Sequence, residues 1–208
     1  MALITAAQAR LAIPGLTGTG EDTNIETVIS RVGAAFARWC GYPPASAGAS
    51  PTMETTSYTL YSGRGGLIDI LDGRFLRVNI WPVTAVSAIY DDPQETYGTA
   101  ITSTYYAIVD GNQGLIGYTV ASGLGWIQPT SENVKNIKIA CSAGFSTVPG
   151  DLAGLAVMAV KHWWDLRHVQ GRTSVVAGSN NASLRDEDLL PAVVRQGLAP
   201  LRLPRAWL

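Results

Sequence analysis

The sequence predicts an α+β protein, a small helical bundle that carries a large antiparallel β-rich insertion and an extended C-terminal tail. Apolar residues recur at helical spacing near the start of the chain and again beyond residue 150, whereas the middle alternates as half-buried strands do. We therefore expect N-terminal bundle helices over 1–42, the β-rich insertion over 53–144, C-terminal bundle helices over 145–199 and the tail over 200–208.

Two capping patterns predict the N-terminal helices. Thr5-Ala-Ala-Gln8 has the spacing of a capping box and starts a short helix, which Pro14-Gly15 ends. Thr23-Asn-Ile-Glu26 repeats the pattern and starts a second helix, closed near Gly41. The apolar face of this second helix consists of Ile25, Val28, Ile29, Val32, Phe36 and Trp39.

The middle of the chain reads as strands separated by turn residues, after a Pro, Ala, Ser and Gly-rich connector over 43–52. Ser62–Gly66 and Asp72-Gly73 are typical of hairpin turns, and Trp81-Pro82 ends a strand because proline cannot donate to a central ladder. The expected strands are Thr56–Tyr61, Leu67–Leu71, Phe75–Ile80, Ala85–Tyr90, Tyr105–Val109, Leu115–Val120 and Ile137–Ser142.

A strand, a turn and a long helix follow one another from Ile137 to Gly171. Gly144 breaks the strand and Pro149 begins the helix, since the first helical residue tolerates a missing N–H. From Leu152 to Trp164 nearly every residue is apolar, which predicts a helix buried on most sides.

The end of the chain is less regular. Residues 172–182 are expected to be a mobile loop, and Leu190-Pro191 begins a last short helix through about Leu198. Pro200 and Pro204 then favour an extended tail.

Composition limits the function classes. Charged residues make up 15% of the 208 residues, against roughly 25% in typical soluble domains, which suggests burial against other subunits. The formal net charge is −1 and the basic residues are scattered except near the C-terminus, so a dedicated nucleic-acid binder is not expected. We expect no secretory signal and no membrane span. Cys40 and Cys141 are interpreted as small buried hydrophobes in a protein of a reducing compartment.

No catalytic, metal or cofactor pattern is recognised. His162 and His168 are six residues apart and point to different faces of a helix. The Gly15–Gly20 loop joins two helices instead of following a strand, so it does not predict a phosphate site. Asp91-Asp92 and Asp186-Glu187-Asp188 fall where solvent-facing turns and helix starts fall, and a structural role is favoured for both clusters.

Trp207 differs from the other tryptophans. It is the second-last residue, on a proline-stiffened tail with Arg202 and Arg205, and a short tail cannot build a core around an indole. Trp207 therefore either folds back on its own domain or inserts into a partner, where Trp and Arg are common anchors.

The layout resembles the head-tail connector, or adaptor, family of long-tailed bacteriophages. The resemblance covers most of the chain, including the two N-terminal helices, the Tyr61–Gly66 turn and the C-terminal Leu190–Arg202 region. Ile80-Trp-Pro-Val-Thr-Ala-Val-Ser-Ala-Ile89 resembles the family's Pro-Val-x-x-Val strand. The more specific part is the order of a strand, Ala143-Gly-Phe-Ser-Thr-Val-Pro149 and the long helix.

The resemblance implies a non-enzymatic neck protein of the virion, made in the host bacterial cytoplasm. Such proteins assemble as a twelve-subunit ring beneath the portal protein, form the platform for the stopper or tail, and leave a channel for DNA. The family's C-terminal segment engages the portal, which maps onto Pro200, Leu201, Arg202, Leu203, Pro204, Arg205, Ala206, Trp207 and Leu208.

Two alternatives remain open. The first is a stopper or tail-completion protein of the virion with a similar helix-plus-β build. The second is a small hydrolase or carbohydrate-binding module built on the β-rich segment, which would need a concave site with converging polar groups. For the adaptor, we also expect the isolated chain to be monomeric until the portal templates its assembly.

Overall fold

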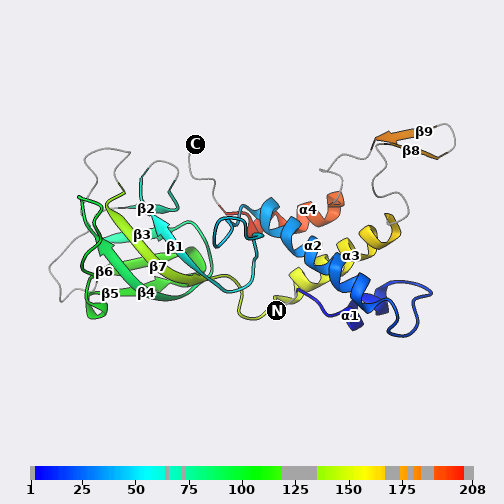
Figure 1. The fold of residues 1–208 in the computed structure, drawn as a ribbon, viewed down its shortest axis with the longest axis horizontal. Coiled ribbons are helices and arrows are strands. Elements are labelled where there is room, and N and C mark those ends of the chain that lie inside the picture. The colour runs from blue at the N-terminus through cyan, green and yellow to red at the C-terminus, as the bar shows by residue number, and fades with distance from the viewer. Residues whose placement is uncertain are drawn as a thin grey trace. The chain divides into compact units, whose positions relative to one another are not determined.

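The computed structural model describes residues 3–63, 66–71, 74–118, 135–166, 174–177, 180–183 and 190–203. It confirms the α+β class, with helices and antiparallel sheets (Figure 1). The chain divides into two compact units, a helical unit of Met1–Cys40 with Val148–Arg202 and a β unit of Gly41–Thr147 with Leu203–Leu208. The backbone thus leaves the helical unit for the β unit twice, after Cys40 and again after Arg202.

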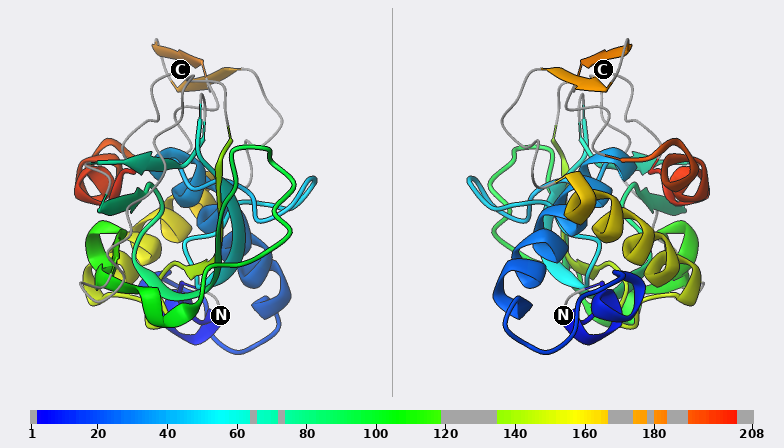
Figure 2. Two further views of the ribbon diagram at one scale, coloured as in Figure 1. Left: turned by 90° about the vertical axis from the view of Figure 1, so that its left-hand side faces the viewer. Right: turned by 90° about the vertical axis from the view of Figure 1, so that its right-hand side faces the viewer.

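The helical unit contains α1 (Ala6–Ala12), α2 (Asp22–Cys40), α3 (Gly150–Asp165) and α4 (Ala192–Leu198). Both α1 and α2 pack on α3, and α4 packs on α3 as well (Figure 2). The predicted apolar face of α2 is confirmed, except that Trp39 is only half buried. The fully buried residues of α2 are Ile25, Val28, Ile29, Val32, Phe36, Ala37 and Cys40.

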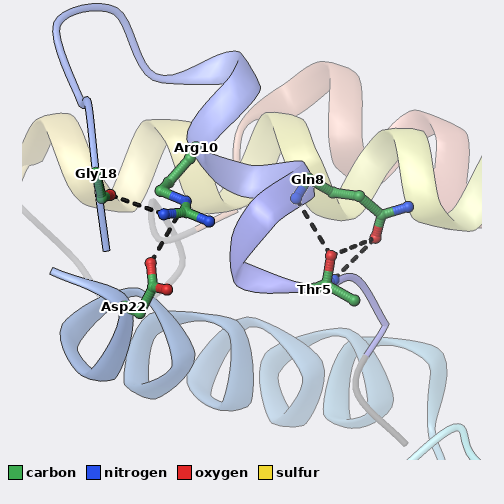
Figure 3. Close-up of polar contacts among 5 residues, drawn as sticks. All are labelled: Thr5, Gln8, Arg10, Gly18 and Asp22. Carbon is green, nitrogen blue, oxygen red and sulfur yellow. Dashed lines mark hydrogen bonds and ion pairs between the residues drawn. The ribbon is translucent and has the colours of Figure 1, made fainter. Parts of the chain in front are cut away.

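The capping box at Thr5 is confirmed (Figure 3). The Gln8 backbone N–H donates to Thr5 Oγ1 at 3.2 Å, and the Thr5 backbone N–H donates to Gln8 Oε1 at 2.8 Å. Two of the amides that a helix start leaves without partners are therefore satisfied.

The predicted capping box at Thr23 is wrong. Helix α2 already begins at Asp22, and the Ile25 amide bonds to the Glu21 carbonyl, so Thr23 lies inside the first turn. Asp22 instead forms an ion pair with Arg10, whose Nε lies 3.4 Å from Asp22 Oδ1 and whose Nη1 donates to the Gly18 carbonyl at 2.7 Å (Figure 3). Arg10 thus binds both the glycine-rich loop and the first residue of α2. The Asp22 carboxylate also lies at the positive end of the α2 dipole, where a negative charge is stabilising.

Helix α3 begins one residue later than predicted, since Pro149 is the N-cap and Gly150 the first helical residue, and Asp151 lies in the first turn as expected. Its buried side is formed by Leu152, Ala156, Ala159, Val160, Trp163 and Trp164. The helix also has an exposed stripe of Asp151, Gly154, Met158 and Asp165, so it is less completely buried than its composition suggested. The predicted stop at Gly171 lies outside the described residues.

The β unit holds two antiparallel sheets, ordered β1-β7-β4 and β2-β3-β6-β5, and all seven predicted strands are confirmed. In the first sheet β7 is central, and Tyr58 on one side and Val86 on the other pair with Cys141. A cis peptide joins Trp81 to Pro82 between β3 and β4. The strands are β1 (Thr56–Tyr61), β2 (Ile68–Ile70), β3 (Phe75–Val78), β4 (Val83–Asp91), β5 (Tyr106–Asp110), β6 (Leu115–Tyr118) and β7 (Ile137–Ala143).

One predicted turn is a hairpin and the other is not. Strands β2 and β3 pair around Asp72-Gly73, although these two residues themselves lie outside the described part. The Ser62–Gly66 prediction is wrong, because β1 and β2 belong to different sheets and meet only through a parallel bridge between Ser62 and Ile68.

The expectation of an irregular loop over 172–182 is also wrong for the part that the structure describes. Strands β8 (Ser174–Ala177) and β9 (Asn180–Ser183) pair antiparallel as a two-stranded sheet. The polar Ser and Asn composition concealed this pairing, since such residues favour turns.

Candidate functional site

The predicted site is the C-terminal segment, and its first part is folded. Helix α4 follows Pro191 and buries Val194 and Leu198. A short 3-10 helix, η6 (Ala199–Leu201), comes directly after it and contains Pro200 and Leu201. Pro200 therefore lies in a helical turn, and Arg202 is the first extended residue after it, because proline fits the start of a 3-10 turn as well as an extended chain.

Arg202 is attached to the end of α2. Its guanidinium carbon lies 4.7 Å from the centroid of the Trp39 ring, within the range of a cation–π interaction. The neighbouring Cys40 thiol lies 4.0 Å from the Leu198 carbonyl, to which it donates a weak hydrogen bond. Burial raises the pKa of Cys40 to about 12, and the charge of Arg202 opposes this shift only in part.

Leu203 belongs to the β unit and is buried. A Cβ placed on Gly41 would lie 3.7 Å from the Leu203 Cβ, in ordinary contact, so the two residues are neighbours. Arg202 thus contacts Trp39 in the last turn of α2, within the helical unit. The next residue, Leu203, lies beside Gly41, the first residue of the β unit.

The nine predicted portal-binding residues therefore fall into two groups. Pro200, Leu201, Arg202 and Leu203 are built into the folded subunit. Pro204, Arg205, Ala206, Trp207 and Leu208 lie outside the described residues. Sequence reasoning missed Trp39 as the partner of Arg202, because a contact so distant along the chain leaves no local signal.

Cys40, Cys141 and Asp92, which the sequence analysis considered for chemistry, have structural surroundings. Cys40 and Cys141 are buried free thiols, as predicted. The Asp92 carboxylate accepts hydrogen bonds from the Thr96 hydroxyl and from the amides of Gln94, Tyr97 and Thr96, and these bonds lower its pKa. Asp92 thereby organises its own loop. His168 and the Asp186–Asp188 cluster lie outside the described residues.

A pocket of about 230 Å³ opens in the β unit. Its lining supplies hydroxyl groups and one lysine, and it contains neither a carboxylate nor a histidine. Ser62 is already committed, since it donates to Asn136 Oδ1 and accepts from the Ile137 amide, both at 3.0 Å. The lining residues are Thr59, Leu60, Tyr61, Ser62, Gly66, Leu67 and Lys135.

The described ranges contain neither a metal-binding cluster nor a membrane-spanning helix. No group of three or more His, Cys, Asp or Glu side chains could hold a metal ion there. Among the helices that the structure describes, none combines the length and the apolar character needed to cross a bilayer.

Comparison with known proteins gives few matches. No protein-family model matches the sequence, and no curated protein does. Among solved structures, the chain is similar to one described as "Neck of native GTA particle computed with C12 symmetry". The TM-score is 0.48 at 16% identity, over 92% of this chain and 95% of that chain.

Proposed function

We propose that this chain is a non-enzymatic neck protein of a virion, a head-tail adaptor. It docks as a ring on the portal protein and forms the platform for the stopper or tail. The observation that carries this proposal is the order of elements along the chain, in which β7 leads through Gly144-Phe145 and Pro149 into α3. Helix α3 follows α1 and α2 in the sequence and precedes α4. This is the order of elements on which the resemblance to the adaptor family depends.

The charge balance suits a channel through which DNA must pass without being held. Each phosphate neutralised by a protein cation adds to affinity, and a ring multiplies every such contact by its subunit number. A chain with a net charge of −1 and no concentrated basic run avoids this retention.

We assign portal binding to Pro204–Leu208, with Trp207 as the main anchor. Residues 200–203 instead attach this peptide to the folded part of the chain: Pro200 and Leu201 lie in η6, Arg202 contacts Trp39 of α2, and Leu203 lies beside Gly41. Trp and Arg, both present in the terminal peptide, are the residues most often found at binding hot spots.

Deletion of residues 204–208 tests this assignment more sharply than deletion of 200–208, which would also remove Arg202 and Leu203 from the fold. The shorter deletion should leave the urea unfolding midpoint unchanged and abolish binding to purified portal rings. Trp207→Ala in the full-length chain should weaken binding at least about 30-fold, the effect of losing about 2 kcal/mol at a hot spot. Undiminished binding by the shorter deletion would refute the anchor.

Localisation in intact particles distinguishes the adaptor from the stopper or tail-completion alternative. A gold or fluorescent-protein label on the chain should appear directly beneath the portal. Label density separated from the portal by another ring would assign the chain to the stopper or tail-completion class instead.

A further inference from the structure

The outer face of the four-stranded sheet in the β unit is apolar. Along β3, β5 and β6 successive side chains point to opposite faces of the sheet. One set of side chains points away from the face that carries buried Leu76 and Ile116. An antiparallel sheet usually carries polar side chains on the face that it does not bury. Here the outward residues include Leu71 and Val109, which are 47% and 57% exposed, and half-exposed Leu115.

Gly117 makes this outer face continuous. It pairs with Phe75 on β3 and Ala107 on β5 and has no side chain of its own. The Phe75 ring and a Val109 methyl group both lie 3.0 Å from the point that a Gly117 Cβ would occupy. Apolar atoms of β3 and β5 therefore meet over the strand between them.

Arg77 is the cation on this outer face. It lies opposite Leu115 on β6 and Asp69 on β2. The Asp69 carboxylate accepts a hydrogen bond from Asn79 Nδ2 at 2.8 Å, whereas Arg77 has no hydrogen bond or ion pair within the described part of the chain. We call Leu71, Arg77, Val109 and Leu115 the sheet face.

A second apolar surface lies on α3 and α4 of the helical unit. The methyl groups of Leu155 lie 2.6 and 2.8 Å from the point that a Gly197 Cβ would occupy, so Leu155 rests directly on α4. Met158 is one turn from Leu155 and lies on the same side of α3. Val193 is likewise one turn from Gly197, on the same side of α4. These two side chains are 45% and 52% exposed.

Asp151 lies on the same stripe of α3, seven residues before Met158. It is exposed, and among the described residues it has no ion pair or hydrogen-bonded partner. The next charges along the helix, Lys161 and Asp165, neutralise each other at 3.1 Å. We call Asp151, Leu155, Met158 and Val193 the helix face.

We propose that the sheet face of one subunit packs on the helix face of a second copy of this chain, with Arg77 against Asp151. Both faces are largely apolar. Arg77 and Asp151 carry opposite charges and lack ion pairs among the described residues, whereas Asp69 beside Arg77 is hydrogen-bonded to Asn79. A charge-poor apolar patch with an arginine is the usual composition of an interface core. The pairing also satisfies both charges, which would otherwise be costly to bury.

Two different complementary faces make a heterologous contact, which closes into a ring when the rotation between subunits permits. The inference thus deepens the proposed ring and rests on it for the final assembly. The contact between two copies can nevertheless be measured without the portal protein.

Site-directed cross-linking tests the contact. Val109→Cys and Met158→Cys place exposed thiols on the sheet face and the helix face, whereas native Cys40 and Cys141 are buried. With a flexible bismaleimide, a mixture of the two variants at up to about 1 mM should give a covalent dimer even if the contact is as weak as a millimolar Kd. Neither variant alone should give a covalent dimer. Glu26→Cys, at an exposed position of α2 outside both faces, is the matched control.

Charge reversal then tests the specific pair. Adding Arg77→Asp to the Val109→Cys variant should lower the yield at least roughly tenfold, and adding Asp151→Arg to the Met158→Cys variant should restore it. Asp151→Arg added to the Met158→Cys variant should by itself lower the yield as well. Because Asp151 is exposed, this variant should fold and tests the pair even if Arg77→Asp fails to fold.

Three results would overturn the proposal. They are no cross-link in the mixture, an equal yield from either variant alone, and a yield that charge reversal does not change. Deleting residues 204–208 should leave the cross-link unaffected, so failure of this interface and failure of the portal anchor are distinguishable.

Discussion

Arg202 stacks on Trp39, with the guanidinium carbon 4.7 Å from the ring centroid, and this contact ties the C-terminal segment to the end of α2. An arginine over an indole is among the better cation–π geometries. The contact fixes the root of the terminal peptide before any partner is present, which reduces the ordering entropy lost on binding.

Replacing Arg202 by Ala should lower the free energy of unfolding by about 0.5–1 kcal/mol, the usual value of an exposed cation–π pair. Trp39→Leu should remove the same interaction, and a double-mutant cycle in urea should yield a coupling energy of that size. Arg38→Ala is the control, since Arg38 is exposed on the same helix and should change stability by less than about 0.5 kcal/mol. Strict additivity of the two substitutions would contradict the prediction.

Thr5→Ala should destabilise the helical unit by about 1 kcal/mol, because it removes the side-chain acceptor of the Gln8 amide. Thr5→Ser keeps the acceptor and should recover most of that loss. Urea unfolding followed by far-UV circular dichroism measures both. Thr17→Ala, in the exposed loop after α1, should have no effect, and a loss equal to that of Thr5→Ala would argue against capping.

Local patterns predicted the elements well where the physics is local. Strands β1, β3 and β7 were predicted because one face of each is buried, which imposes alternation. The Thr5 cap was predicted because its bonds span three residues. The same pattern at Thr23 gave a wrong prediction, since the Ile25 amide already bonds to the Glu21 carbonyl and α2 starts at Asp22, which pairs with Arg10.

Features set by distant contacts could not be predicted. Nothing near Ser62 shows that β1 and β2 enter different sheets, because that is decided by the pairing of β1 with β7. The contact of Arg202 with Trp39, and separately that of Leu203 with Gly41, likewise join residues far apart in the sequence. The portal anchor itself stays a prediction.

Two glycines should respond in opposite directions to alanine. Gly144 has a φ of +111°, and an added Cβ would meet the Glu54 carbonyl and lie 2.9 Å from the Met53 carbonyl oxygen. Gly144→Ala should therefore cost more than about 2 kcal/mol. Gly154 lies inside α3 with no atom within 4 Å of the added Cβ, so Gly154→Ala should stabilise the chain by about 0.8–1 kcal/mol. Thermal and urea unfolding of both variants check the pair, and a neutral Gly144→Ala would contradict the strained geometry.

The two thiols should make the fold sensitive to alkali. Burial raises the pKa of Cys40 to about 12 and that of Cys141 to about 11, whereas an unfolded thiol ionises near about 8.5. Their contribution to stability is therefore complete below about pH 8.5 and declines as the pH rises towards 11–12, because the unfolded state loses its protons first.

The free energy of unfolding should accordingly fall between pH 9 and pH 11, by at most about 1.4 kcal/mol per pH unit for each thiol. The Cys40→Ala and Cys141→Ala double variant should be less stable at pH 7, because it leaves cavities, yet should lose less stability above pH 9. Urea titrations of both proteins from pH 7 to pH 10.5 measure the two slopes. Equal slopes would show that other groups cause the alkaline loss and that the native thiols ionise as readily as unfolded ones.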